Sequence, residues 1–347
     1  MEEQKTSLLG MTLEELRRVA ASVGLPPYAA RQMADWLYKK RITSVAEMTN
    51  VALRAREALA ERYEVGAAHP VDAARSADGT VKYLFSAGDK RFVEAVYIPA
   101  EGRDTLCVSS QVGCRMACRF CMTGRQGFGA NLTAGEIVNQ ILHLPESESL
   151  SNLVFMGMGE PMDNVDEVLR ALEILTSDYG CGLSPRRITV STVGVAGDGL
   201  RRFLRESECH LAVSLHSPFA EERARLMPAE RACPAAEVVA LLREHDFSHR
   251  RRVSFEYIMF EGVNDTMRHV KALAALLRGL PCRVNLIRFH AIPGVELRSC
   301  SAEQMLRFRD ALNARGVVCT IRASRGEDIQ AACGMLSTKK IMAARGE

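Results

Sequence analysis

Strand-like and helix-like segments alternate through the last two thirds of the chain, and this alternation constrains the fold more than any other feature. Short apolar runs typical of buried strands occur at residues 105–109, 152–156, 187–191, 210–215, 253–259, 283–287 and 317–321. Helical patterns occur at residues 133–142, 164–176, 198–204, 235–245, 266–277 and 302–314. Strands that are joined through helices pair in parallel. About six such units predict an α/β fold whose sheet curves into a partial (β/α)6 barrel.

The first hundred residues have a different pattern. Residues 8–64 predict three short helices, and the first of them opens with a capping box between Thr12 and Glu15. The basic ends of these helices suit an RNA-binding unit, but plain helix packing fits the pattern equally well. Residues 71–98 alternate with period two between turns, which predicts a short antiparallel β extension. We therefore expect an N-terminal helical domain over 1–64, a β linker over 65–100 and the barrel over 101–347.

Composition limits the class of protein. The 347 residues are 47% apolar and 25% charged, as in soluble globular proteins, and no stretch approaches the roughly 18 apolar residues of a membrane span. The net charge of +3 permits an RNA partner without requiring one. Eleven cysteines without a recognisable signal peptide predict a reducing, cytoplasmic location, where thiols bind metals or carry out redox chemistry.

Three of the cysteines form a tight C-x3-C-x2-C run at Cys114, Cys118 and Cys121. A [4Fe-4S] cluster normally takes one cysteine per iron, so three ligands would leave one iron open. A structural zinc site is an alternative, but it would need a fourth ligand from elsewhere in the chain. A chance grouping is the remaining alternative, and the close spacing argues against it.

Small polar residues and glycines follow the predicted strands. Such groups occur at residues 107–110, 157–161, 191–194, 214–216 and 261–265 and at Asn285. In α/β barrels the carboxyl ends of the strands carry the ligand chemistry. The pattern therefore predicts a site for a polar ligand at this end of the barrel.

The cysteine run resembles the signature of radical S-adenosylmethionine (SAM) enzymes, in which the amino and carboxylate groups of SAM chelate the open iron. Gly157-Met158-Gly159-Glu160-Pro161 resembles the motif that holds the SAM amino group in those proteins. Glycines there permit close backbone approach, and a carboxylate pairs with an ammonium group. The resemblance implies a [4Fe-4S] cluster, SAM and a radical SAM partial barrel.

A narrower resemblance covers nearly the whole chain. Segments similar to the RlmN/Cfr family of RNA adenosine methyltransferases lie at residues 92–99, 105–114, 127–128, 131–132, 156–162, 214–216 and 325–334. By this resemblance Cys333 becomes S-methylcysteine, Cys107 is its disulfide-forming partner in product release, and Glu94 is the catalytic glutamate. Cys107 could also be a core residue, because it alternates with apolar residues in a strand. The matched SAM-contacting positions are Gly159, Glu160, Ser191, Ser214, Leu215, His216 and Asn285.

The implied chemistry is consistent with the reactivity of adenine. Carbons 2 and 8 of the ring are poor nucleophiles, so a polar attack on the SAM methyl group is unpromising. A 5′-deoxyadenosyl radical can instead remove a hydrogen from a methyl group on a cysteine, and the resulting carbon radical can add to the ring. A second cysteine must then release the product by disulfide formation, which requires two cysteines outside the cluster run.

Three functions remain open from the sequence. We expect methylation of adenine carbon 2 in 23S rRNA and tRNA, with a Cfr-like carbon-8 methyltransferase as the alternative. A non-enzymatic iron–sulfur RNA-binding redox sensor is a third possibility, although it would not need a methyl-carrying cysteine. The expected partners are these RNAs and a reducing electron donor such as flavodoxin or ferredoxin, and we expect a monomer with no membrane association.

Overall fold

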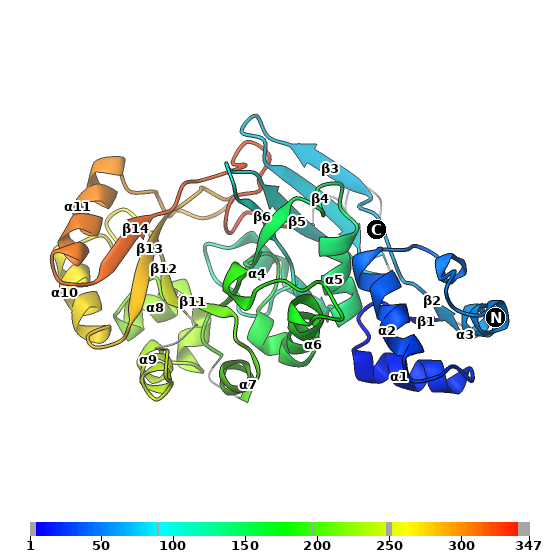
Figure 1. The fold of residues 1–347 in the computed structure, drawn as a ribbon. Coiled ribbons are helices and arrows are strands. Elements are labelled where there is room, and N and C mark those ends of the chain that lie inside the picture. The colour runs from blue at the N-terminus through cyan, green and yellow to red at the C-terminus, as the bar shows by residue number, and fades with distance from the viewer. Residues whose placement is uncertain (1–4, 89, 196–197, 248–251, 339–347) are drawn as a thin grey trace.

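One ten-stranded sheet organises the molecule (Figure 1). The computed structural model describes residues 5–88, 90–195, 198–247 and 252–338. The strand order is β14-β13-β12-β11-β10-β9-β6-β5-β4-β3, and the strands from β6 to β14 pair in parallel. The parallel strands are β6 (Asp104–Cys107), β9 (Leu150–Phe155), β10 (Ile188–Thr192), β11 (His210–Ser214), β12 (Val253–Met259), β13 (Cys282–Arg288) and β14 (Val318–Ile321).

Helices connect these strands, six of them at the positions that the alternation predicts. They are α5 (Ala134–Leu142), α6 (Val165–Thr176), α7 (Asp198–Glu206), α8 (Ala220–Leu226), α9 (Ala235–Arg243), α10 (Met267–Leu276) and α11 (Ala302–Asn313). The strands β3 and β14 lie at opposite edges of the sheet, so the described part of the barrel does not close. The incomplete α/β barrel expected from the sequence is therefore confirmed.

The antiparallel strands extend the main sheet. They are β3 (Asp72–Arg75), β4 (Val81–Ser86) and β5 (Phe92–Ile98). Each pairs with the next, and β5 also pairs antiparallel with β6. This pairing places β5 directly beside the first parallel strand, with β4 one strand further out.

The N-terminal helices pack onto the barrel. They are α1 (Leu13–Ser22), α2 (Ala29–Ala34) and α3 (Leu53–Arg62), with a π-helical turn (Asp35–Lys39) and the short parallel strands β1 (Thr6–Ser7) and β2 (Tyr63–Glu64). The predicted capping box is present, since Glu15 accepts a hydrogen bond of 2.8 Å from the Thr12 N–H. Gly10 approaches Gly135 of α5 so closely that an added Cβ would lie 2.2 Å from the Gly135 nitrogen. The apolar side chains of this unit belong to the same hydrophobic core as those of the barrel.

Two elements that the sequence did not predict surround the cysteine run. The strands β7 (Gln111–Gly113) and β8 (Phe128–Asn131) form a hairpin, and the short helix α4 (Met122–Gln126) follows the third cysteine. Gly113 has φ +72°, and a Cβ there would lie 1.7 Å from the Gly127 carbonyl oxygen. The hairpin therefore requires glycine at this position.

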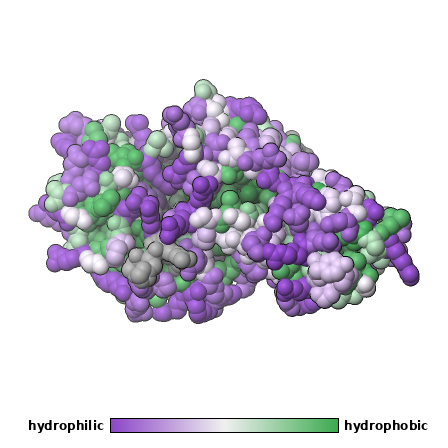
Figure 2. All heavy atoms as spheres, in the orientation of Figure 1, coloured by the Kyte–Doolittle hydropathy of each residue, from purple (hydrophilic) through white to green (hydrophobic). Residues whose placement is uncertain are grey.

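The exposed face in Figure 2 is largely hydrophilic, with hydrophobic residues visible in a hollow near its middle. No helix within the described part of the chain is long and apolar enough to cross a membrane.

Candidate active site

Two adjoining cavities lie at the carboxyl ends of the parallel strands. The smaller, of about 140 Å³, is lined by all three cysteines of the run together with Gly159, Glu160, Ser191, Ser214 and His216. The larger, of about 380 Å³, is lined by Cys107, Cys121, Met156, Arg322 and Cys333. Cys333 lines both cavities. The structure thus brings together most of the residues that the sequence singled out.

The three cysteines of the run stand at one wall of the smaller cavity. Cys114 and Cys118 are buried and Cys121 is partly buried. Burial raises the pKa of Cys114 to about 12, and burial followed by the neighbouring cysteines raises the pKa of Cys118. Thiols in this setting become thiolates when a metal supplies positive charge. The donor set therefore fits a metal centre.

The described geometry is compatible with a cluster. Among the residues with described positions, no three Cys, His, Asp or Glu side chains are placed to ligate one metal ion. Each cysteine of a cubane cluster binds a different iron, so the thiols need not converge on one point. The zinc alternative therefore gains no support from the described geometry.

The turn at 157–161 is held rigidly against the loop that follows β6. Ser109 Oγ accepts a hydrogen bond of 2.8 Å from the Met158 N–H, and Gln111 Oε1 accepts one of 2.8 Å from the Glu160 N–H. A Cβ on Gly157 would lie 2.7 Å from the Val108 carbonyl oxygen, and Gly159 has φ +104°. Both glycines are therefore required by close packing or by a left-handed backbone.

Glu160 places a buried carboxylate at the end of this turn. Its Oε1 accepts a hydrogen bond of 2.6 Å from the Thr192 hydroxyl, and its Oε2 accepts one of 2.9 Å from the Val193 N–H. Burial raises the pKa of Glu160 to about 7, against the lowering effect of these donors. A cation in the cavity would therefore stabilise the ionised form of this carboxylate.

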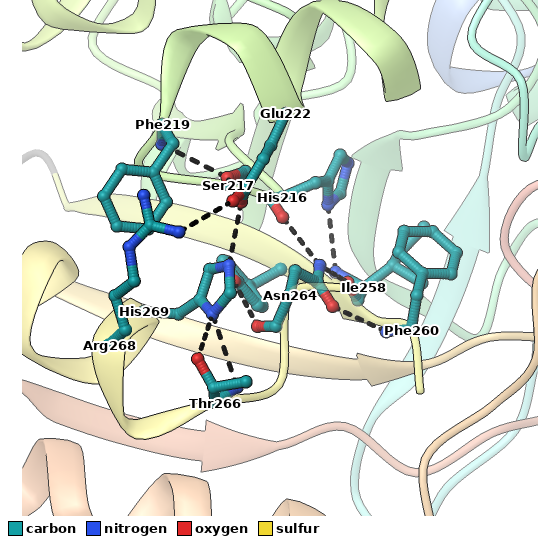
Figure 3. Close-up of polar contacts among 11 residues, drawn as sticks. His216, Ser217, Phe219, Glu222, Ile258, Phe260, Asn264, Thr266, Arg268 and His269 are labelled. Atoms are coloured by element: carbon teal, nitrogen blue, oxygen red, sulfur yellow. Dashed lines mark hydrogen bonds and ion pairs between the residues drawn. The ribbon is translucent and has the colours of Figure 1, made fainter. Parts of the chain in front are cut away.

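His216 is fixed at the end of β11 by contacts from β12 and the loop after it (Figure 3). Its Nδ1 accepts a hydrogen bond of 2.9 Å from the Ile258 N–H, and its carbonyl oxygen accepts one of 2.7 Å from Asn264 Nδ2. The residue has φ +56°, an uncommon left-handed conformation for a non-glycine residue. Burial, followed by the charge of Arg223, lowers the pKa of His216 to about 3, so the ring is neutral.

The ends of β11 and β10 are tied together by a fully buried arginine. Arg223 donates hydrogen bonds to the carbonyl oxygens of Val193 (2.7 Å), Ser214 (2.9 Å) and Leu215 (3.0 Å) and forms an ion pair with Glu230. The side chain of Leu215 is fully buried. Its backbone N–H donates to the Glu256 carbonyl oxygen at 3.0 Å, and Leu215 lines neither cavity.

The catalytic-loop candidate, residues 333–338, lies against the cysteine run. Its Gly334 carbonyl oxygen accepts a hydrogen bond of 2.7 Å from the Met122 N–H, and its Leu336 carbonyl accepts one of 2.7 Å from Thr123 Oγ1. Glu94 holds the loop from the other side, because its carboxylate accepts a hydrogen bond of 2.8 Å from the Ser337 N–H. Glu94 therefore contacts the site through this loop rather than from a cavity wall.

Glu94 also has a cationic partner. Lys82 Nζ lies 2.9 Å from Glu94 Oε1, and the Glu94 side chain is almost fully buried. Burial raises the pKa of Glu94, while Lys82 lowers it. The ion pair links β4 to β5, and the hydrogen bond from Ser337 links Glu94 to the loop that carries Cys333.

Cys107 and Cys333 are both free thiols in the structure. Cys107 is buried at the end of β6, and burial, followed by its proximity to Cys333, raises its pKa to about 12. Cys333 is exposed at the shared wall of the two cavities. Arg322 lies in the same larger cavity and donates to Met156 Sδ at 3.2 Å.

Sequence reasoning missed three charged residues near the site. Lys82 carries no motif, and Arg322 immediately follows a strand without distinguishing neighbours. Glu256 had a usable signal, because it is a lone carboxylate within the otherwise uncharged strand β12, and a charge in such a strand is rarely buried without a reason. Asn285, which the resemblance did identify, donates to Glu256 Oε1 at 2.8 Å.

The chain has clear relatives among known proteins. The radical SAM superfamily matches residues 108–274, and the ribosomal RNA large subunit methyltransferase N-terminal domain matches residues 6–65. A probable dual-specificity RNA methyltransferase RlmN of Parabacteroides distasonis is 65% identical over 97% of this chain and 98% of its own length. The dual-specificity RNA methyltransferase RlmN of Syntrophus aciditrophicus is 40% identical over 98% of this chain and 99% of its own.

A solved structure agrees with these matches. A radical SAM methyltransferase from Sphaerobacter thermophilus superposes with a TM-score of 0.89 at 40% identity, covering 95% of this chain and 99% of that one. Sequence and fold therefore correspond over nearly the full length. The chain belongs to the RlmN family of radical SAM RNA methyltransferases.

Proposed function

We propose that this protein methylates carbon 2 of adenosine in 23S rRNA and in tRNA, with Cys333 as the methyl carrier and Cys107 as the releasing thiol. The main supporting observation is that Cys333 lines both cavities, whereas Cys107 lines only the larger one. The names of the relatives, which describe dual-specificity RNA methyltransferases, support the two kinds of RNA substrate.

The smaller cavity fits a [4Fe-4S] cluster with SAM beside it. Cys114, Cys118 and Cys121 would hold three irons, and Glu160 would pair with the SAM amino group. Gly159, Ser191, Ser214 and His216 would complete the contacts, with Leu215 and Asn285 next to them. When bound, the pair would supply both the methyl group and the radical that activates it.

The protein's own groups then have separate tasks. Cys333 carries the methyl group on its sulfur at the junction of the two cavities and presents it to an adenine in the larger one. Cys107 attacks the Cys333 sulfur to form a disulfide, which breaks the bond between Cys333 and the methylated product. Glu94 holds the backbone of the Cys333 loop through Ser337, so its first role is positioning.

The remaining proposals concern the domain division, the electron donor, the oligomeric state and the cellular location. The domain division at 64 and 100 is proposed to separate an RNA-contacting helical unit and a β linker from the barrel. A low-potential donor such as flavodoxin or ferredoxin would reduce the cluster. The protein would act as a monomer in the cytoplasm, where ribosomes and tRNA are present.

The position of the methyl group on the product tests the proposal. Anaerobically reconstituted protein should be incubated with SAM, a reductant and either 23S rRNA fragments or tRNA, and the digested nucleosides analysed by mass spectrometry against 2-methyl- and 8-methyladenosine standards. We expect 2-methyladenosine from both RNAs. Formation of 8-methyladenosine would instead assign the Cfr-like activity, and an unmodified RNA with a reducible cluster would favour a redox sensor.

A further inference from the structure

The segment that carries Cys333 crosses the open side of the barrel. The strand β14 lies at one edge of the sheet, and the β3–β4 hairpin lies at the other. After β14 the chain runs back towards β5 and β6, as the red segment in Figure 1 shows. On the way, residues 326–331, here called the anchor loop, contact the turn between β3 and β4 at residues 76–80. The segment therefore links the two edges of a barrel that its strands leave open.

Two aspartates tie the anchor loop to this turn in a reciprocal way. Asp328 of the anchor loop accepts hydrogen bonds from the Ser76 hydroxyl (2.6 Å) and the Ala77 N–H (3.2 Å). Asp78 of the turn accepts one of 2.9 Å from the Gly326 N–H. Each carboxylate thus binds donors of the opposite loop. Hydrogen bonds to ionised acceptors are stronger than those between neutral groups, so this contact is firmer than ordinary loop packing.

The backbone of the anchor loop is compact and fits closely against the turn. Gly326 has φ +61°, and an added Cβ there would lie 2.9 Å from Thr80 Cγ2. The Gly326 carbonyl oxygen accepts a hydrogen bond of 2.8 Å from the Ala331 N–H, so the loop closes on itself. Cys333 follows only two residues later. The docked loop therefore fixes the chain immediately before the sulfur.

A buried histidine holds the start of the same segment. His290, just beyond the end of β13, lies 3.2 Å from Glu327 Oε1 through its Nδ1 and 3.0 Å from Ser324 Oγ through its Nε2. His290 is buried and lines the larger cavity. The contacts with α4 and Glu94 described above hold the chain after Cys333. Cys333 is therefore held on both sides.

We propose that Asp78 and Asp328 are positioning residues for the methyl carrier, because docking of the anchor loop on the β3–β4 turn keeps the Cys333 sulfur at the junction of the two cavities. This role depends on the proposed function, in which Cys333 carries the methyl group. Neither aspartate lines either cavity, so any effect on the reaction passes through the anchor loop. A displacement of about 1 Å at the reacting atom is enough to lower a rate about 100-fold.

Asp328→Ala in full-length, cluster-reconstituted protein tests this role. We expect kcat for RNA methylation to fall about 10- to 100-fold while the KM for RNA changes less than about twofold, since the substitution leaves the cavity walls intact. The amount of 5′-deoxyadenosine formed per methylated adenosine should rise, because a displaced methyl group meets the adenine less often. Asp328→Asn should recover most of the rate, since an amide can accept from the Ala77 N–H and donate to the Ser76 hydroxyl. Asp78→Ala, on the other side of the contact, should show the same pattern as Asp328→Ala.

A matched control and a measurement without turnover separate the possible failures. Asp72→Ala removes an exposed carboxylate of the same hairpin that accepts only from its neighbour, the Ala73 N–H, and it should behave like wild type. Without SAM or RNA, the Ala331 amide should exchange its hydrogen faster in Asp328→Ala than in wild type or Asp72→Ala, at equal iron content. Ser76→Ala, a milder change that removes one donor, should show a smaller effect in the same direction.

Three results would count against the proposal in different ways. Unchanged hydrogen exchange in Asp328→Ala would overturn the anchor itself. An equal loss of kcat in Asp328→Asn and Asp328→Ala, with an unchanged ratio of 5′-deoxyadenosine to methylated adenosine, would show that the aspartate acts only on structure. Wild-type protein that methylates no RNA would instead overturn the proposed function, and hydrogen exchange would still report whether the anchor exists.

Discussion

Of the two candidate catalytic cysteines, only Cys333 lines both cavities, whereas Cys107 lines the larger one. Replacing each cysteine should therefore block a different step of the reaction. Cys333→Ala should neither accept a methyl group from labelled SAM nor form an RNA adduct. Cys107→Ala should accept the methyl group but leave RNA attached through Cys333, visible as a nuclease-sensitive band on a denaturing gel.

Neither cysteine belongs to the C-x3-C-x2-C run, so both variants should keep the iron content of wild type, which serves as the control. Wild-type turnover by Cys107→Ala, with no trapped RNA, would contradict the roles assigned to this pair.

The ion pair between Lys82 and Glu94 provides a second test at this scale. Lys82→Met leaves a nearly fully buried carboxylate without its cation, which should lower the free energy of unfolding by about 3 kcal/mol. The double variant Lys82→Met/Glu94→Gln removes the charge and should recover much of that loss. Urea denaturation of wild type, Lys82→Met, Glu94→Gln and the double variant measures the effect, and a double variant no more stable than Lys82→Met would contradict it.

At the scale of elements, a buried histidine at the end of α5 packs against the segment that joins the N-terminal helices to the sheet. His143 ends α5, and its ring meets that of His69 edge-on at 5.9 Å. Burial, followed by the nearby charges of His69 and Arg41, lowers the pKa of His143 to about 4 from an ordinary 6.5. Protonation therefore favours the unfolded state, in which the ring titrates normally.

Stability should accordingly depend on pH in a defined range. The contribution of His143 is fully present above pH 6.5 and is lost as the pH falls towards 4, by up to about 3 kcal/mol. Thermal or urea unfolding across this range should show a shallower loss of stability for His143→Gln than for wild type. Identical slopes for the two proteins would assign the acid sensitivity to other groups.

Periodicity predicted the elements better than it predicted their contacts. The alternation of strands and helices was confirmed because buried apolar residues recur along the parallel strands from β6 to β13. The β7–β8 hairpin and α4 were missed, since the glycines and cysteines there have no amphipathic period. Glu256 and Lys82 were missed for another reason. Strand pairing places Glu256 opposite Asn285 and Lys82 diagonally across from Glu94, and this pairing cannot be read from local pattern.

For the whole molecule, the cysteine run should determine iron content. We expect anaerobically purified protein to hold about four irons per chain, and Cys114→Ala, Cys118→Ala or Cys121→Ala each to lose the cluster, because three ligands leave no redundancy. Cys319→Ala, which removes a buried thiol of β14, should keep it. Iron analysis and visible absorption measure the outcome. One zinc per chain with no iron would contradict it.

The N-terminal unit shares its hydrophobic core with the barrel, and this affects how its proposed RNA-binding role should be tested. Leu8, Leu16 and Met33 are fully buried in the same core as the barrel strands, so deleting residues 1–64 would expose apolar surface as well as remove any RNA contacts. Surface substitutions avoid this problem. A hollow on this unit is lined by Arg17 and Lys39 and holds the exposed ring of Tyr28, a combination suited to phosphate and base contacts.

We predict that Arg17→Gln/Lys39→Gln weakens RNA binding at low salt. The slope of the logarithm of the RNA-binding constant against the logarithm of salt concentration should also become shallower, by about 0.7 to 0.9 for each phosphate that the protein no longer neutralises. The matched control is Lys271→Gln/Arg315→Gln, which removes two charges from a hollow at the opposite end of the molecule, beside α10 and α11 (Figure 1). Filter binding with tRNA at several salt concentrations measures both slopes. Equal slopes for the two double variants would show that the N-terminal unit does not bind phosphates through these side chains and that RNA is held by the barrel alone.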